Sequence, residues 1–416
     1  MPPLDLSDIM TLGNFLLNKV MTMLSSEIKK LSSDILSEVI SLRRTIHREP
    51  ELGFKEFKTS TLVANYLDSL GLKVTKGIAG TGVVGLLEGT SPGKTIAIRA
   101  DMDALPIQEE TDLPYASSIP GVMHACGHDV HTSIVLGTAN ILSKLKDQIK
   151  GNVKFIFQPG EEGLGGAKKM IEEGALDNPK VDAIIALHVA PNCKTGQISV
   201  SSGPVMASPS EFKLEIKGRG GHAAEPQKAI DPIIIGTNIV NLFQTIVSRS
   251  KDPLKSAVLS VTCFQAGNTF NIIPSNAIIK GTVRTFDSLL DDEISKRMLA
   301  IISSVTGAMG AEYSFEYVKS YPPVVNSKEM VDLIVNASLK VTEKENIILD
   351  KQVSMLAEDF SYYLNEVPGA LFNLGCSEPN CNHFENLHSS KLIADENCIS
   401  VGMEVFTQAV VDFFSN

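Results

Sequence analysis

Met123-His-Ala-Cys-Gly-His-Asp-Val-His131 contains three of the eight histidines and one of the six cysteines of this chain. Imidazole and thiolate groups bind borderline-soft divalent metals, and Cys126 and His128, separated by one glycine, can turn towards the same ion. A helix start that happens to be rich in histidine is the alternative interpretation of this stretch alone. We predict a metal site here, to which other parts of the chain add ligands.

Short apolar runs lie on both sides of this stretch and end in polar side chains. They deliver Asp101 and Asp103 after 95–99, Glu161 and Glu162 after 153–157, and His188 after 182–187. Helical periodicity at 58–70 and 132–145 alternates with these runs, which indicates an α/β fold with a mostly parallel central sheet flanked by helices. Ligands of such sheets bind at the carboxyl ends of the strands. We therefore expect the polar side chains to meet at one edge of the sheet.

The pattern changes after residue 205. The order becomes strand 212–217, helix 230–247, strands 257–265 and 276–286, helix 291–309 and strand 311–318. A β-α-β-β-α-β order is typical of a compact α+β sandwich. A chain of 416 residues is also too long for one core. We predict an N-terminal helical extension at 1–30, a catalytic domain made of 31–205 and 319–416, and a smaller inserted domain at 206–318.

Composition excludes several classes of protein. A net charge of −11 argues against a nucleic-acid partner, which needs a basic face. No run reaches the ~18 apolar residues of a membrane span, so we expect no membrane partner. The N-terminal stretch lacks a basic region and a small-residue cleavage site, and the six cysteines form no tight framework. These features favour a cytoplasmic protein.

The candidate ligands are too many for one open metal site. They are Cys126, His128, Glu161 or Glu162, His188 and His388. One catalytic zinc takes three protein ligands plus water, whereas five ligands suit two metals about 3.5–4 Å apart. The sequence therefore predicts a two-metal centre.

Eight ordered motifs resemble those of the metal-dependent aminoacylase/carboxypeptidase family. They are Arg99-Ala-Asp-Met-Asp-Ala-Leu-Pro106, 123–131, Gln158-Pro-Gly-Glu-Glu-Gly163, Gly220-Gly-His-Ala223, Asn271-Ile-Ile-Pro274, Gly281-Thr-Val-Arg284, Ala357-Glu-Asp-Phe360 and His388-Ser-Ser390. The resemblance runs from about residue 40 to the end of the chain. It is strongest to the subgroup of N-acyl-amino-acid amidohydrolases, hippurate hydrolases and auxin-conjugate hydrolases.

The resemblance implies roles for the candidate ligands. Two divalent ions would be bound by Cys126, His128, Glu162, His188 and His388, with Cys126 as the bridging ligand. Glu161 would be the general base, and the alternative exchanges the roles of Glu161 and Glu162. Asp103 would orient a ligand and Asp101 is left open, and a salt-bridged pair near Arg99 is the alternative for either residue. A thiolate favours zinc, but manganese, cobalt or nickel could occupy such a site.

The inserted domain would be a lid and dimerisation domain by the same resemblance. It implies that His222 donates to the scissile carbonyl oxygen across the interface of a homodimer or dimer-based oligomer. Asn271 and Arg284 would clamp the α-carboxylate of the substrate.

These expectations combine into one function. We predict a two-metal hydrolase of the amide bond in N-acyl amino acids, which releases a free amino acid and a carboxylic acid. One alternative is a metallocarboxypeptidase that acts on short peptides. The other is a metal-binding or assembly protein without catalysis, although such a protein has no need of Glu161.

Overall fold

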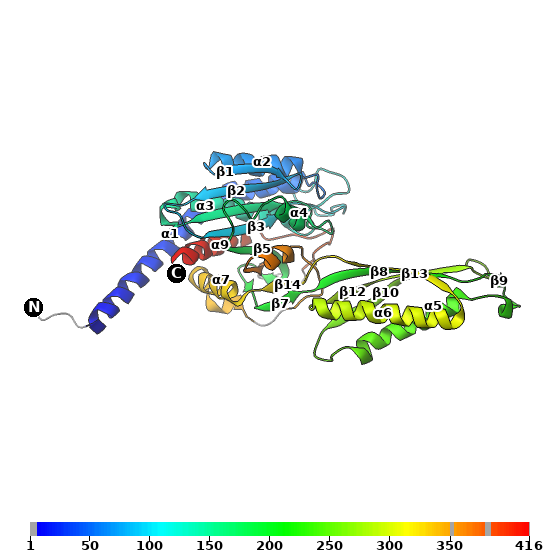
Figure 1. Ribbon diagram of the computed structural model, residues 1–416. Coiled ribbons are helices and arrows are strands. Elements are labelled where there is room, and N and C mark those ends of the chain that lie inside the picture. The colour runs from blue at the N-terminus through cyan, green and yellow to red at the C-terminus, as the bar shows by residue number, and fades with distance from the viewer. Residues whose placement is uncertain (1–5, 350–352, 379–383, 416) are drawn as a thin grey trace, which may run out of the picture. The chain divides into compact units, whose positions relative to one another are not determined.

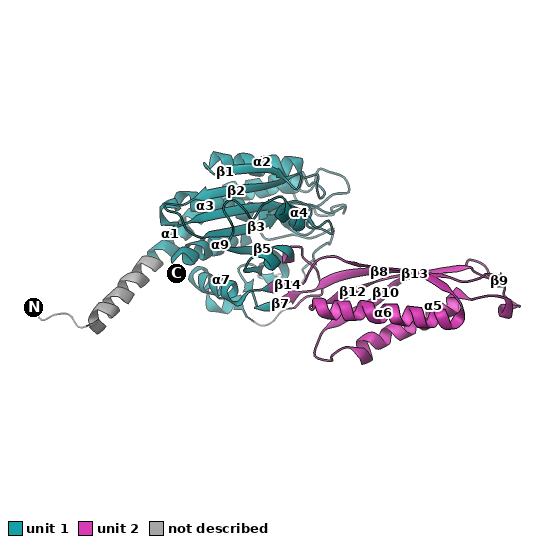
Figure 2. Ribbon diagram, in the orientation of Figure 1, with its two compact units in different colours: residues 1–203, 326–352, 362–416 teal, residues 204–325, 353–361 magenta. Residues whose placement is uncertain are grey.

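The computed structural model describes residues 6–349, 353–378 and 384–415. It contains two compact units (Figure 2). Unit 1 comprises residues 1–203, 326–352 and 362–416, and unit 2 comprises residues 204–325 and 353–361. Residues 1–5 of the predicted N-terminal extension lie outside the described residues. The rest of that extension forms the start of a long helix, α1 (Leu6–Arg48).

Unit 1 contains an eight-stranded sheet (Figure 1). In spatial order its strands are β1 (Lys73–Ile78), β2 (Gly82–Glu88), β4 (Asn152–Gln158), β3 (Thr95–Asp101), β5 (Ala183–Lys194), β16 (Gly369–Ser377), β6 (Ile198–Ser199) and β15 (Ile347–Ile348). The four neighbours β4, β3, β5 and β16 run parallel to one another, whereas β1, β2 and β6 pair antiparallel. This arrangement confirms the predicted mostly parallel sheet.

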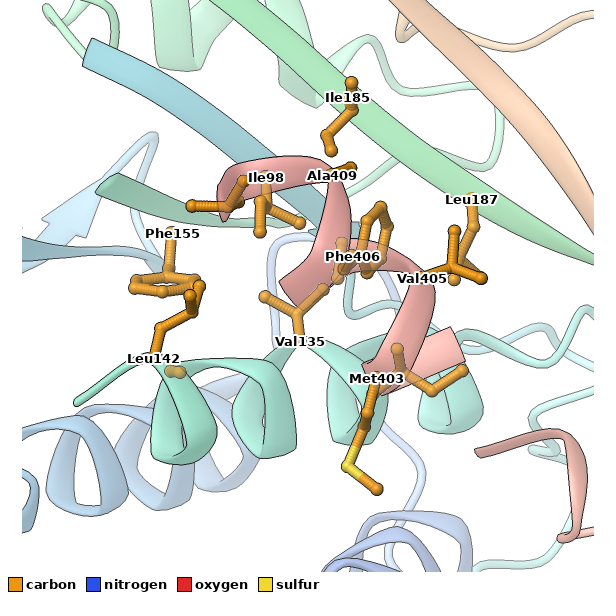
Figure 3. Packing of buried hydrophobic residues seen from close by; sticks show 14 of the residues in the cluster. Ile98, Val135, Leu142, Phe155, Ile185, Leu187, Met403, Val405, Phe406 and Ala409 are labelled. Atoms are coloured by element: carbon orange, nitrogen blue, oxygen red, sulfur yellow. The ribbon is translucent and has the colours of Figure 1, made fainter. Parts of the chain in front are cut away.

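Helices cover this sheet. They are α2 (Phe57–Ser69), α3 (His128–Lys144), α4 (Gly166–Glu172), α7 (Lys328–Val341) and α9 (Cys398–Ser415), and α1 packs on α3 and α9. The short helix α8 (Ser361–Glu366) precedes β16. Figure 3 shows Val135 of α3 and Phe406 of α9 beside Ile98 and Ile185 of the sheet. Each such buried side chain stabilises the fold by about 1.5–3 kcal/mol. Among the described helices α9 alone is long and apolar enough to cross a membrane, but 67% of it is buried within the protein as a core helix.

Helix α3 begins at His128, four residues before the periodicity predicts. Gly127 has the left-handed φ of +81°, and its carbonyl oxygen accepts hydrogen bonds from Val130 N (2.9 Å) and His131 N (3.2 Å). These two hydrogen bonds form the first turn of the helix, which therefore starts before the apolar spacing from which helical periodicity is recognised. Two histidines of the opening stretch, His128 and His131, therefore lie in the first turn of α3, and His124 precedes the helix.

Unit 2 is built on a four-stranded antiparallel sheet with the order β10 (Ala257–Gln265), β12 (Asn276–Thr285), β8 (Ser208–Lys217) and β13 (Glu312–Lys319). Helices α5 (Pro232–Thr245) and α6 (Ser288–Met309) pack against it and against each other around a core that includes Leu214 and Ile239. Asp231 and Asp287 accept backbone N–H groups at the starts of these helices. Two further sheets have two strands each: β9 (Gly221–His222) pairs with β11 (Ile272–Ile273), and β7 (Gly203–Met206) pairs with β14 (Val324–Asn326).

Candidate metal centre

Cys126 and His128 lie at the start of α3, on either side of Gly127. A β-carbon at Gly127 would come within 2.5 Å of Val189 Cγ2, and the φ of +81° is one that other residues rarely adopt. Glycine therefore allows the chain to reverse tightly against β5. The reversal places the Cys126 thiol and the His128 ring, both buried, on the same side of the turn as His188.

Each of the two histidines is held through one ring nitrogen. His128 Nδ1 lies 2.8 Å from Asp103 O, and His188 Nδ1 lies 2.8 Å from Val189 O. His188 Nε2 is 3.4 Å from Cys126 Sγ. His128 Nε2 is buried and makes no hydrogen bond with a described residue, and Asp101 Oδ2 lies 3.8 Å from it. In a metal-binding histidine one ring nitrogen typically donates to a backbone carbonyl or carboxylate, and the other nitrogen faces the ion.

His188 was expected to follow the end of a strand, but it lies inside β5. This strand pairs with β3 only as far as Ala186, opposite Arg99, and then continues to Lys194. His188 is therefore level with the end of β3, where Asp101 lies. The polar side chains do meet at one edge of the sheet, because β5 extends past its neighbour.

Cys126 belongs to two groups of ligating atoms. Its Sγ and the ligating atoms of His128 and His188 all lie within 4.8 Å of one another, and so do those of Cys126, Glu162 and His388. His388 Nε2 is 3.1 Å from Glu162 Oε1. The donor set of one thiolate, one carboxylate and three imidazoles suits two divalent ions with a shared thiolate.

Glu161 and Glu162 follow β4 and differ in their surroundings. Within unit 1, the carboxylate of Glu161 groups with His128 and Glu162, but the described residues place it in no group with Cys126. The backbone nitrogens of both residues donate to Asp103, Glu161 N to Oδ1 and Glu162 N to Oδ2, each over 3.0 Å. The side chain of Asp103 therefore binds this turn, and the backbone carbonyl of Asp103 binds the ring of His128.

His388 reaches the centre from the C-terminal part of the chain. Its backbone nitrogen donates to Ala125 O over 2.7 Å, which ties it to the residue before Cys126. Its φ of +66° is a left-handed conformation that costs a residue with a side chain about 1–2 kcal/mol. The surrounding contacts therefore hold this histidine in a conformation that it would not adopt alone.

The charges of the cluster compensate one another. Burial raises the pKa of the Cys126 thiol, but the His188 and His128 rings outweigh this effect and lower that pKa to about 6. Hydrogen bonds to Cys126 and Glu162 raise the pKa of His388 to about 10. These two shifts favour a thiolate at Cys126 paired with an imidazolium at His388. Metal binding at these residues would displace the imidazolium protons.

Asp101 takes the salt-bridge alternative. Its Oδ2 lies 2.7 Å from Arg99 Nη1, and its Oδ1 lies 2.7 Å from His131 Nδ1. His131 Nε2 in turn accepts Val189 N over 2.9 Å. Both nitrogens of His131 are therefore occupied, so it supports the backbone beside His188. No role was predicted for His131, although its place about one helical turn after His128 was a usable signal.

A second buried network lies behind Asp129 and was also missed. Asp129 Oδ2 is 2.7 Å from Arg43 Nε and 2.8 Å from His47 Nδ1, and His47 Nε2 is 3.2 Å from Glu109 Oε1. These ion pairs join the end of α1 to the start of α3. No local pattern in the sequence distinguishes Arg43 or His47 from ordinary helix residues.

The three predicted substrate-binding residues lie in unit 2, at opposite ends of its sheet. His222 pairs with Ile272, and Ala223 N donates to Asn271 O over 3.0 Å, so His222 and Asn271 are neighbours beyond the start of β12. They line a pocket of about 770 Å³. Arg284 lies near the end of β12, opposite Pro209. The eight residue steps of β12 from Asn276 to Arg284 separate the two sites by roughly 26 Å.

Asn271 and Arg284 of one chain therefore do not form the clamp that was predicted, because the length of β12 keeps them apart. Arg284 Nη1 donates to Thr282 Oγ1 over 2.5 Å, and the guanidinium makes no ion pair with a described residue. Burial lowers the pKa of Arg284 from its ordinary value. A half-buried guanidinium without a carboxylate partner is suited to bind an anion.

Comparison with known proteins identifies relatives over most of the chain. The family model "Peptidase family M20/M25/M40" matches residues 97–412. "Thermostable carboxypeptidase 1" of Saccharolobus solfataricus is 39% identical over 93% of this chain and 98% of that protein. "N-acyl-L-amino acid amidohydrolase" of Geobacillus stearothermophilus is 46% identical over 74% of this chain and 83% of that protein. The solved structure of Bacillus subtilis YXEP protein, a dinuclear metal binding peptidase, has a TM-score of 0.80 and 33% identity, and covers 92% of this chain and 99% of that one.

Proposed function

Because this chain belongs to peptidase family M20/M25/M40 and is a metal-dependent amidohydrolase or carboxypeptidase, we propose that its substrate is an N-acyl amino acid. Hydrolysis of the amide bond releases a free amino acid and a carboxylic acid. The observation that carries the proposal is the position of Cys126, whose Sγ belongs to two groups of ligating atoms beside Glu161. The name of the Geobacillus stearothermophilus relative gives the substrate class.

Two divalent ions would be held by the side chains that meet at Cys126. One group is His128 and His188, the other is Glu162 and His388, and Cys126 is common to both. Zinc is the ion that a thiolate with imidazoles favours, while manganese, cobalt or nickel also fit nitrogen and oxygen donors. Such ions, when bound, polarise an amide carbonyl and lower the pKa of water.

Glu161 is the general base of the proposed reaction. Its carboxylate takes a proton from the attacking water and passes it to the leaving nitrogen of the amide. Its side chain is buried next to His128 and Glu162, and Asp103 holds its backbone nitrogen. A buried carboxylate beside the ligands, but outside the groups that contain Cys126, suits this role.

The substrate-binding residues come from two copies of the chain. Arg284 binds the α-carboxylate of the amino acid, and His222 and Asn271 of a second copy contribute the polar groups at the scissile amide. The support is the roughly 26 Å of β12 between the two sites, which one small substrate cannot bridge. His222 and Asn271 are exposed, as residues that serve a second chain must be. The proposed enzyme is therefore a homodimer.

Complementation between inactive variants tests this arrangement. His222→Ala and Arg284→Ala are each inactive, but a mixture allowed to exchange subunits recovers about a quarter of the wild-type activity. Half of the dimers are then hybrid, and each hybrid has one intact site. The matched control is a mixture of His222→Ala with Asn271→Ala. This mixture should recover no activity, because both changes remove residues that the second copy supplies, so that no hybrid dimer has an intact site. Recovery in the control mixture would instead place Asn271 with Arg284.

The substrate class is tested with paired compounds. Converting the α-carboxylate of an N-acetyl amino acid to a primary amide leaves the guanidinium of Arg284 without its partner. That loss costs about 2–5 kcal/mol, so kcat/KM should fall by at least ~30-fold. Equal rates on the acid and the amide would refute the proposed function.

A carboxypeptidase that acts on short peptides is the second candidate, because the Saccharolobus solfataricus relative bears that name. Both functions use a free α-carboxylate, so rates on N-acetyl amino acids and on dipeptides separate them.

The described cysteines are all free thiols, which suits the reducing cytoplasm as the site of action.

A further inference from the structure

The turn that carries Glu161 and Glu162 is held by two buried carboxylates. Three consecutive backbone nitrogens donate to them: Gly160 N to Glu56 Oε1 over 2.9 Å, and the next two to Asp103 over 3.0 Å each. Glu56 is 0% exposed and Asp103 is 1% exposed. Successive N–H groups that point the same way form a concave anion site. Here side chains of the protein itself occupy it.

Glu56 joins this turn to two other segments. Its Oε1 also accepts Phe54 N over 2.9 Å, and its Oε2 accepts the hydroxyl of Thr81 over 2.5 Å. Three donors from three parts of unit 1 therefore converge on one side chain. A buried donor that loses its acceptor costs about 1–3 kcal/mol, so each of these groups depends on Glu56.

The segment that contains Glu56 packs against the turn without spare room. Gly160 has a φ of +59°, and a β-carbon there would lie 3.0 Å from the ring of Phe54. A β-carbon at Gly53 would lie 3.1 Å from Gly160 Cα. Phe54 itself has a φ of +60°, a strained conformation that its hydrogen bond to Glu56 helps to hold. A shift of the Glu56 carboxylate would therefore move Gly160 with it.

We propose that Glu56 is a positioning residue, which fixes through Gly160 the directions in which Glu161 and Glu162 leave the turn. This inference rests on the roles proposed above for those two residues. Hydrogen-bond partners that orient metal ligands typically contribute 10–100-fold to metal affinity. A misplacement of a reacting group by about 1 Å can cost ~100-fold in rate. Among the described residues the Glu56 carboxylate binds Gly160 N, Phe54 N and the Thr81 hydroxyl, so its effect on the ligands passes through the backbone of the turn.

Three variants test the proposal. Glu56→Ala should weaken the binding of Zn(II) to the metal-free enzyme by about 10–100-fold, measured by titration, and lower kcat by a similar factor with KM within ~3-fold. Glu56→Gln keeps an oxygen at Oε1 for Gly160 N and Phe54 N, and should return both quantities to within a few-fold of wild type. Glu56→Asp withdraws the carboxylate by one methylene and should lose at least ~10-fold in Zn(II) affinity, which provides the measurement if the alanine variant does not fold.

Glu51→Ala is the matched control. The Glu51 carboxylate accepts Lys58 N (2.9 Å) and Thr59 N (3.0 Å) at the start of α2, in the same segment, and does not contact the turn. It should lower the unfolding temperature and leave Zn(II) affinity unchanged. The proposal is overturned if Glu51→Ala weakens Zn(II) binding as much as Glu56→Ala does, or if Glu56→Asp binds Zn(II) like the wild type. Titration needs no substrate, so failure of the wild type on N-acyl amino acids would refute the proposed function and leave this test intact.

Discussion

Replacing Glu161 and Glu162 by glutamine, one at a time, distinguishes the base from the ligand. The structure makes the two exchanges comparable, because both backbone nitrogens are held by Asp103 and glutamine keeps the shape of each side chain. Only Glu162 shares a group of ligating atoms with Cys126 and His388. The two variants should therefore differ in which property they lose.

Glu161→Gln removes a proton acceptor and no ligand. We expect kcat to fall by about 10²–10⁴-fold, the usual contribution of a general base, with two metals still bound. Glu162→Gln removes an anionic ligand. Structural zinc sites bind with about 10–16 kcal/mol over four ligands, or roughly 2.5–4 kcal/mol for each. Metal affinity of Glu162→Gln should therefore fall by about 10²–10³-fold.

The assay is metal content after dialysis, with kcat measured in excess metal. The reasoning is refuted if Glu161→Gln loses an ion and retains activity in excess metal, while Glu162→Gln keeps both ions and loses turnover. That outcome would exchange the two roles although Glu162 is the closer to His388. Loss of metal from both variants would show that Glu161 is also a ligand.

Three further predictions follow from single contacts. Arg43→Met leaves the buried carboxylate of Asp129 without the guanidinium that lies 2.7 Å away. The free energy of unfolding should fall by about 3–5 kcal/mol and lower the urea midpoint, and an unchanged midpoint would contradict the buried ion pair. A thiol reagent should inactivate the metal-free enzyme at neutral pH, and added Zn(II) should block it, since the pKa of Cys126 is lowered to about 6; inactivation that ignores the metal would remove Cys126 from the site. Gly166→Ala would place a β-carbon 1.6 Å from Pro159 O and should destabilise the protein by at least about 1–3 kcal/mol in thermal unfolding, whereas an unshifted transition would show that the turn can relax.

Local pattern was sufficient for the class of fold. Alternating helices and short apolar runs predicted the α/β class because periodicity depends on a few neighbouring residues and on which face is buried. The same reasoning placed the start of α3 four residues late, since a glycine with a left-handed φ and two backbone hydrogen bonds begin that helix. Candidate ligands could also be chosen from residue type, because few side chains bind soft divalent ions.

The sequence by itself therefore determined the fold class, the order of the motifs and the chemistry of the candidate ligands. Residue type alone left Glu161 and Glu162 open as ligands, the resemblance implied Glu162, and the tertiary structure groups Glu162 with Cys126. It also separated Asn271 from Arg284 and brought Glu56 to Gly160. The physical reason is that these distances depend on the lengths of strands and on turns far apart in the chain. No local pattern of residues records such distances.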